Sequence, residues 1–148
     1  MATNPLVAQG TLNRVRCSVI VPNYSNLNIT SPYMGKSFAS IDFEGAFDEQ
    51  IETATGVVTS PEPYVMATVT VGLLRTQSLA LAWLTQAQTI SDLGTITIHS
   101  DTSAWPAITI GSAVIRSLEP GAYDGMDPVA RLTLRGVYDI NNNLWNLS

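Results

Sequence analysis

The chain has 148 residues, of which 45% are hydrophobic and only 13% are charged, and its formal net charge is −5. A chain of this length is the size of one domain with a single core, and its acidic balance excludes a general attraction to nucleic-acid phosphates or anionic lipid. Since ordinary soluble domains carry about 25% charged residues, we expect much of the exterior to be neutral or covered by other subunits.

The few reactive side chains exclude several kinds of site. One Cys and one His cannot form a disulfide framework or a zinc site, so we predict no metal and no cofactor. Cys17 alternates with Val15, Val19 and Val21 and is expected on the apolar face of a strand. The N-terminus lacks the pattern of a signal peptide and the apolar runs are too short to cross a bilayer, which predicts a cytosolic protein without membrane contact.

Alternating apolar and polar residues predict strands along most of the chain. In the second strand Ser40, Asp42 and Glu44 share one face. In the third, which we expect to pair with the second, Thr68 and Thr70 share one face. Polar side chains should therefore gather on one side of this strand pair. The expected strands cover residues 14–21, 38–47, 64–74, 95–99, 107–116 and 130–138.

The periodicity changes once, after the third strand. Leu79, Trp83, Leu84 and Ala87 recur at helical spacing, and this predicts one helix between a cap at Thr76 and a terminating glycine at Gly94. The strand at 107–116 changes phase at Gly111-Ser112, which predicts a β-bulge. Turn-forming residues at 119–128 separate the last two strands.

Two segments are expected to lie outside the strands. Residues 48–63 are predicted as a long projecting loop, since Thr-Gly and Pro-Glu-Pro interrupt them, and long loops in compact domains often contact a partner. The short C-terminal tail, residues 141–148, is polar apart from Leu144, Trp145 and Leu147, which can dock on this subunit or on a neighbour.

The order of elements predicts a single domain over residues 1–148, because no repeat or linker interrupts it. We expect a mainly β protein, an antiparallel β-sandwich or open barrel with one flanking α-helix. Unpaired strand edges are normally protected by Lys, Pro or inward charge, and these strands have few such residues. Edges are therefore predicted to pair between subunits, and a cyclic array of subunits would close into a larger barrel.

Charges of opposite sign are separated along the chain. Six of the twelve acidic residues fall between Asp42 and Glu62, where no Lys or Arg occurs, so we expect a negatively charged sheet surface. Four arginines alternate on two predicted strands, either as solvated residues or as ion-pair partners of a neighbour's acidic loop. These are Arg14, Arg16, Arg131 and Arg135.

Enzyme sites find little support in the sequence. His99-Ser100-Asp101 has the residue types of a catalytic triad, but consecutive strand residues point to opposite faces. Asp42 and Glu44 could form a glycosidase pair, although no aromatic sugar platform lies nearby. Asp42, Glu44 and Asp48 lack the spacing of a calcium loop. We therefore expect a protein that is not an enzyme.

The layout as a whole resembles a known family. An opening strand, an acidic strand, a long projecting segment, a Thr/Val strand, one amphipathic helix and a closing set of strands look like the tail tube proteins of contractile bacteriophages. Those proteins are related to the tubes of phage-like bacteriocins and type VI secretion systems. The resemblance covers residues from about 11 to 138 and rests on layout, since the family has no short diagnostic motif.

The resemblance implies a structural virion protein. Subunits of the family form hexameric rings that stack into a hollow tube, and double-stranded DNA passes through it without specific binding. The implied location is the virion tail, assembled in the host cytoplasm, and the implied partners are the sheath, baseplate, tail terminator and tape measure proteins. The candidate channel-lining residues are Ser40, Asp42, Glu44, Thr68 and Thr70. The candidate inter-ring contacts are Asp48, Glu49, Glu52, Val57 and Val58.

An acidic wall would suit such a conduit, because cationic side chains would hold DNA by releasing its counterions, whereas carboxylates repel it. The alternative from another class is a β-sandwich binding module for carbohydrate or for another virion or secretion component. The mass of the purified protein discriminates between the two, since only the first must form rings or polymers.

Overall fold

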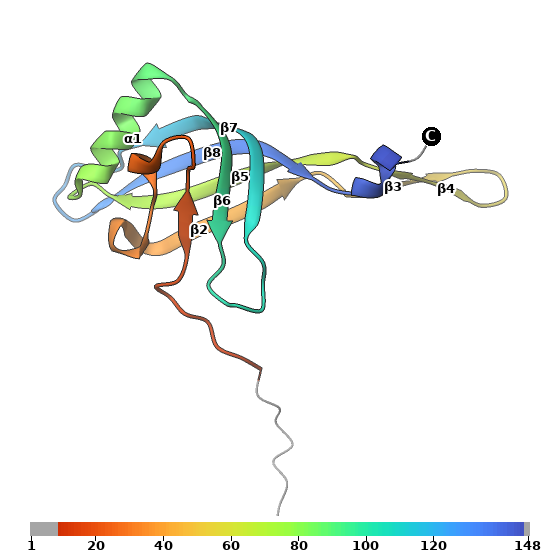
Figure 1. The fold of residues 1–148 in the computed structure, drawn as a ribbon, viewed down its shortest axis with the longest axis horizontal. Helices are drawn as coiled ribbons and strands as arrows, with labels where there is room; N and C mark the ends of the chain where they lie inside the picture. Colours follow the sequence, from red (N-terminus) through yellow and green to blue (C-terminus); the bar gives the residue numbers. More distant parts are fainter. Residues whose placement is uncertain (1–8, 147–148) are drawn as a thin grey trace, which may run out of the picture.

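Most of the chain forms one curled antiparallel sheet, from which a separate hairpin projects (Figure 1). The computed structural model describes residues 9–146. The strands are β1 (Ser18–Ile20), β2 (Met34–Glu44), β3 (Asp48–Glu52), β4 (Val57–Pro61), β5 (Tyr64–Leu74), β6 (Asp92–His99), β7 (Ile108–Glu119) and β8 (Val129–Asp139). The helices are α1 (Ser78–Thr89) and the 3₁₀ turns η1 (Ser25–Leu27), η2 (Ser31–Tyr33) and η3 (Asn142–Asn146).

The main sheet has six strands in the order β1-β6-β7-β8-β5-β2, and every neighbouring pair is antiparallel. It curls into half of a barrel, and its two edge strands, β1 and β2, do not pair with each other in the described part of the chain. This confirms the predicted fold class, a mainly β open barrel with one flanking helix. The expected pairing of the second and third predicted strands is also confirmed, because β2 is hydrogen-bonded to β5.

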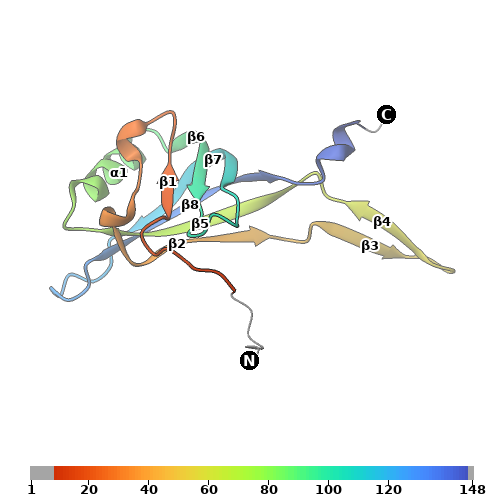
Figure 2. The same ribbon diagram turned by 60° about the horizontal axis from the view of Figure 1, so that its bottom comes forward.

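The core lies on the inner side of the curl. Alternate residues of β5 from Val65 to Leu73 are buried, and Leu132 and Leu134 of β8 are fully buried beside them. Helix α1 covers this side with Leu79 and Trp83, and Figure 2 shows the helix and the segment before β2 above the same face. Apolar burial on one face only leaves the opposite face of β5 and β8 uncovered.

The opening strand is shorter than predicted. Residues 14–16 form a turn, because the Asn13 side chain accepts a hydrogen bond from the Val15 N–H at 3.0 Å and the Asn13 carbonyl accepts one from the Arg16 N–H at 3.1 Å. Asn side chains compete for backbone groups in this way. Arg14 and Arg16 are therefore exposed residues of a turn and do not alternate along a strand.

The helix boundaries also differ from the prediction. The N-cap position is Gln77 and the helix ends at Thr89, so neither Thr76 nor Gly94 bounds it. Gly94 lies within β6 at a φ of +74°, where its missing side chain leaves room for the Asn23 amide that donates to the Leu93 carbonyl at 3.2 Å. Gly94 is therefore needed for the close approach of Asn23, and its prediction as the terminator of the helix was wrong.

The segment predicted as a long loop is a β-hairpin. Residues 48–52 of β3 pair with residues 57–61 of β4, with Ile51 opposite Val58. Its turn is closed by Thr53, whose backbone N–H and side-chain hydroxyl donate to the Gly56 carbonyl at 2.8 and 2.9 Å. The predicted bulge in β7 is confirmed, since the register with β8 shifts after Gly111 and Ser112 has a φ of +49°.

Close packing of β7 on β8 depends on Gly136, which is buried. A Cβ atom there would contact Ile110 and lie 2.8 Å from the Gly111 carbonyl oxygen. We expect Gly136→Ala to lower the free energy of unfolding by about 1–3 kcal/mol, because overpacking shifts the strands apart. Chemical denaturation measures this. In the control Gly56→Ala the added methyl group meets open space, so the free energy of unfolding should change by less than about 0.5 kcal/mol. Equal effects of the two substitutions would contradict the overpacking explanation.

Candidate assembly surfaces

The uncovered side of the sheet, named here the polar face, brings the predicted channel-lining residues together. It is formed by the outward side chains of β2, β5, β8 and the last part of β7. The strand register places Ser40 opposite Thr70 and Asp42 opposite Thr68, and it places Glu44 opposite Met66 at the end of β2. Two neighbouring rows of polar side chains therefore run along the edge of the sheet, as the alternation predicts.

A salt bridge neutralises part of this face. The Arg135 guanidinium on β8 donates to both carboxylate oxygens of Glu44, with N···O distances of 2.7 and 3.3 Å. The Thr68 hydroxyl on β5, the strand between them, donates to the same carboxylate at 2.7 Å. These bonds, that of Arg135 above all, lower the pKa of Glu44 to about 2 and raise the pKa of Arg135.

The polar face is consequently not the purely acidic surface that the sequence suggested. Arg131 and Arg135 both lie on the outward side of β8, with Thr133 between them, and Arg116 on β7 is close enough to contribute to the lowered pKa of Glu44. The acidic cluster was visible in a single stretch of sequence, whereas these arginines reach the face through the pairing of distant strands. Arg135 forms its ion pair within its own chain. This corrects the expectation that it would be either solvated or paired with the acidic loop of a neighbour.

The Glu44–Arg135 pair gives a titration that can be observed directly. Because the folded pKa lies below the ordinary value of 4.5, the pair's contribution to stability is complete above about pH 4.5 and is lost as the pH falls through about 2. We expect a ¹³C NMR titration of the Glu44 carboxylate to have its midpoint at about pH 2. In Arg135→Gln this midpoint should move to higher pH. Arg116→Gln should change the midpoint much less. A wild-type midpoint at the ordinary value would rule the pairing out.

Both sides of the strand group that carries the polar face end in edges that pair with no further strand among the described residues. On one side, the Ala39 N–H of β2 bonds to Cys17 and so points away from β5. Because backbone groups alternate along a strand, those of Ile41 and Phe43 point the same way. On the other side, β6 begins opposite Val114, so the described strands leave residues 116–119 of β7 paired with β8 alone.

The β3–β4 hairpin is the second candidate surface, and every residue of β3 is exposed. It extends beyond the sheet along the long axis of the molecule (Figure 1). Three large apolar side chains are more than half exposed, Ile51 at 54%, Val57 at 58% and Val58 at 52%. An isolated hairpin is only marginally stable, and exposed apolar side chains in a group mark interaction sites. The acidic residues Asp48, Glu49 and Glu52 lie on the same hairpin.

Asn141 fixes the base of the hairpin. Its side-chain amide donates to the Phe47 carbonyl at 2.9 Å and to the Glu62 carbonyl at 2.8 Å, and the Glu62 N–H donates to the Phe47 carbonyl at 3.0 Å. Asn141 has a φ of +49°, a conformation that Asn tolerates better than most residues. Sequence analysis missed this role, because Asn141 lies in a polar tail with three further Asn residues.

We expect Asn141→Gly to loosen the hairpin without unfolding the sheet, because glycine keeps the positive φ but removes two hydrogen bonds of about 1 kcal/mol each. Amide hydrogen exchange should accelerate in residues 48–61 and stay unchanged in β5 and β8. Asn143→Gly, on the exposed η3 turn, is the matched control. Unchanged exchange in the hairpin would show that Asn141 does not hold it.

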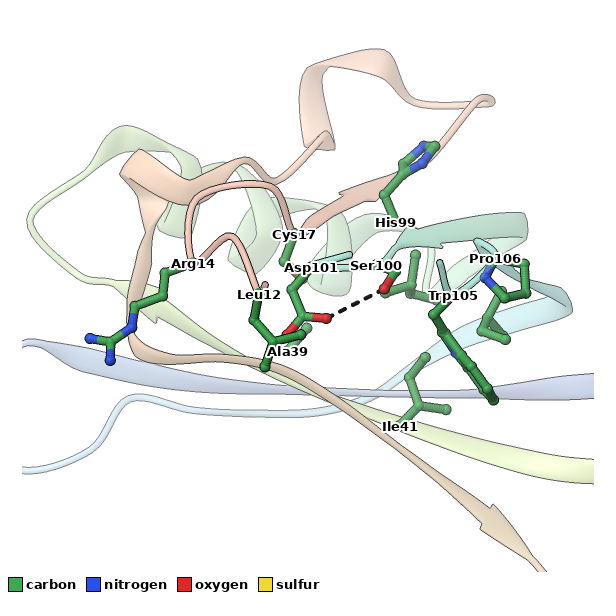
Figure 3. A pocket seen from close by; sticks show the side chains of 12 residues that line it. Leu12, Arg14, Cys17, Ala39, Ile41, His99, Ser100, Asp101, Trp105 and Pro106 are labelled. Carbon is green, nitrogen blue, oxygen red and sulfur yellow. Dashed lines mark hydrogen bonds between the residues drawn. The ribbon is translucent and has the colours of Figure 1, made fainter. Parts of the chain in front are cut away.

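A pocket of about 540 Å³ opens beside the N-terminal segment, between β2 and the end of β6 (Figure 3). Cys17 and Ile41 line it, and burial raises the pKa of the Cys17 thiol. Ser100 donates to Asp101 at 3.4 Å, while the His99 ring points away from both. The geometry therefore does not assemble a nucleophile–base–orienter relay.

The geometry also gives no support to the glycosidase pair or the metal site considered in the sequence analysis. Glu44 is held ionised by Arg135, whereas a glycosidase acid needs a raised pKa. Among residues 9–146, no three His, Cys, Asp or Glu side chains come together as possible metal ligands. The described residues also contain no helix long and apolar enough to span a membrane.

The C-terminal residues lie at the hairpin end of the molecule. Leu144 is half-buried and Trp145 is exposed on η3, while Leu147, named with them in the sequence analysis, lies outside the described residues. Taken together, the described residues form an open curled sheet with a polar face, two unpaired strand edges and a projecting hairpin. Unpaired strand edges are places where another chain can add a strand.

Comparison with known proteins gives distant structural likenesses. The tube-terminating cap of the anti-feeding prophage aligns over 92% of both chains, with 16% sequence identity and a TM-score of 0.48. The sheath/tube terminator of an extracellular contractile injection system, PVC, aligns over 95% of this chain and 96% of that chain, with 15% identity and a TM-score of 0.47. A chain of the extended PVC sheath–tube complex aligns over 89% and 90%, with 16% identity and a TM-score of 0.48.

No family model and no curated protein sequence matches the chain. Sequence identities this low, with TM-scores below 0.5, do not assign the chain to a family.

Proposed function

We propose that the protein is a structural subunit of a phage-type tail tube, which assembles into hexameric rings that stack into a hollow conduit for DNA. The observation that carries this proposal is the uncovered polar face bounded by two open edges. A polar sheet face can line a water-filled channel, and open edges can continue the sheet from copy to copy. The conduit, the hexamer and the DNA are parts of the proposal.

The direction of the strands supports ring closure. The strands β7, β8, β5 and β2 alternate in direction, so the two outer strands of this group run opposite ways. Rotation about an axis roughly along the strands preserves those directions. The β2 edge of one copy therefore meets the β7 edge of the next copy in the antiparallel sense, which is the geometry that a continuous ladder requires.

Six such copies would enclose a wide channel. Four strands from each copy make a barrel of 24, and at a spacing of about 4.8 Å its backbone diameter would be roughly 37 Å before strand tilt widens it. Its inner wall would carry Ser40, Asp42, Glu44, Thr68 and Thr70. The β3–β4 hairpin would reach the adjacent ring, with Asp48, Glu49, Glu52, Val57 and Val58 as contacts.

The charges of the polar face are of mixed sign, and part of the face suits passage without binding. Arg135 on the channel wall would attract phosphate, but its bidentate bond to Glu44 cancels that charge at short range. Asp42 stays beside neutral Thr68 and adds a weak repulsion. Thr, Ser and the Glu44–Arg135 pair offer DNA few counterion-releasing contacts, whereas Arg116 and Arg131 on the same face would add some attraction. Sheath, baseplate, terminator and tape measure proteins would be the further partners, in a tail assembled in the host cytoplasm.

The test is the state of assembly and its dependence on the β2 edge. We expect electron microscopy of the concentrated protein to show rings or tubes, and Ile41→Pro to abolish them, because proline removes the outward N–H needed by a neighbour's strand. Ile41→Ala loses the same side chain but keeps that N–H, and it should still assemble. Circular dichroism checks that both variants fold. Assembly by Ile41→Pro would exclude pairing at this edge.

Monomers under all conditions would argue against a tube. A stable monomer that binds a glycan array would instead favour the alternative, a β-sandwich binding module.

A further inference from the structure

The end of the molecule opposite the hairpin carries a second apolar projection. Residues 119–128, named here the end loop, join β7 to β8 at this end, and both Figure 1 and Figure 2 show the two projections at opposite ends of the long axis. Tyr123 and Met126 are 82% and 87% exposed. Large apolar side chains that are exposed to this extent are candidates for contact with a partner.

Arg75 holds the end loop in one shape. Its guanidinium donates to the Ala122 carbonyl at 2.6 Å and to the Asp127 carbonyl, and it lies 5.0 Å from the centre of the Tyr123 ring. The Arg75 backbone N–H donates to the Pro128 carbonyl at 2.8 Å. The side chain that orders the loop therefore also orients the exposed aromatic ring by a cation–π contact.

Aspartate side chains inside the end loop complete its order. Asp124 accepts hydrogen bonds from the Met126 and Asp127 N–H groups at 2.9 and 3.2 Å, and these bonds lower its pKa. Asp127 accepts from the Val129 N–H at 3.2 Å. Because the loop is already ordered, little conformational entropy remains to be lost when it meets a partner.

We propose that the end loop receives the β3–β4 hairpin of the next copy in the stack. The proposal rests on the proposed function, and it names the surface that the hairpin contacts. Two different surfaces at opposite ends of one molecule make a heterologous contact, which repeats without limit along an axis. Ile51 and Val58, which lie opposite each other on one face of the hairpin, would cover Tyr123 and Met126, with Val57 beside them on the other face.

Charge sets a condition on this pairing. The hairpin carries Asp48, Glu49 and Glu52, and no basic residue occurs between Lys36 and Arg75. The end loop also carries carboxylates, Glu119, Asp124 and Asp127, and the charge of Arg75 acts on Asp124, whose pKa it helps to lower. The apolar contact must therefore overcome a repulsion between the two ends, and added salt should strengthen stacking by screening that repulsion.

Cross-linking in assembled tubes tests the contact. In a Cys17→Ser background, which removes the single native thiol, Val57→Cys is combined with Met126→Cys. The two positions belong to opposite ends of one chain, so a short bismaleimide can join them only between copies. We expect a ladder of covalent multimers on denaturing gels. Val57→Cys combined with Trp105→Cys, which lies at the pocket between β2 and the end of β6, should give none.

A second variant tests the energy of the contact. Tyr123→Ser with Met126→Ser should leave rings intact and raise the concentration needed for stacking by about tenfold or more, as measured by sedimentation and electron microscopy. Trp105→Ser, an exposed aromatic elsewhere, should stack normally. Three results would overturn the inference while the tube proposal stands. They are normal stacking of the end-loop variant, loss of the rings in that variant, and a ladder of multimers with the Val57→Cys and Trp105→Cys pair. Failure of the unmodified protein to form rings would overturn both.

Discussion

The whole molecule depends on a sheet that is packed on one side only. Helix α1, with the segment before β2, covers the inner side of β5 and β8 through side chains such as Trp83 and Leu134. A chain with one substantial helix cannot cover both faces of an eleven-residue strand such as β5. The second face must then be polar to stay in water, and the strands at its margins keep unpaired backbone groups.

The ion pair on this face has a structural consequence beyond its charge. Glu44 belongs to the edge strand β2 and Arg135 to β8, so their contact spans β5, where Thr68 joins the same carboxylate. An edge strand held only by its ladder would slip or fray at its end. The pair connects the last residue of β2 to β8 in the interior of the sheet. This contact fixes the register of the edge that a neighbour would extend. An exposed pair adds little stability by itself, but it adds this geometric constraint.

The local sequence pattern predicted the features that depend on neighbouring residues in the chain. It failed for features that depend on the pairing of segments far apart in the sequence. Alternation around Asp42 and Thr68 was sufficient for the strand pair and its polar side. The hairpin was missed because Thr, Gly and Pro at residues 53–63 are typical of loops, and the Ile51–Val58 pairing becomes evident only in three dimensions. The partner of Glu44 depended on the register of β8, 91 residues away in sequence, and no local signal carries that information.

Rigid ends suit an assembly built from many identical weak contacts. Asn141 fixes the hairpin at its base and Arg75 fixes the end loop, in both cases through side-chain donors to backbone carbonyls. A single hairpin buries too few apolar side chains for tight binding, since area alone does not give affinity. The proposed ring would present all its hairpins at once, however, so after the first contact the others would form at a high effective concentration. Loose projections would lose that advantage, because each would need to be ordered separately. In the proposed stack, the side chains that order the two ends would therefore be as important as the apolar residues that would touch.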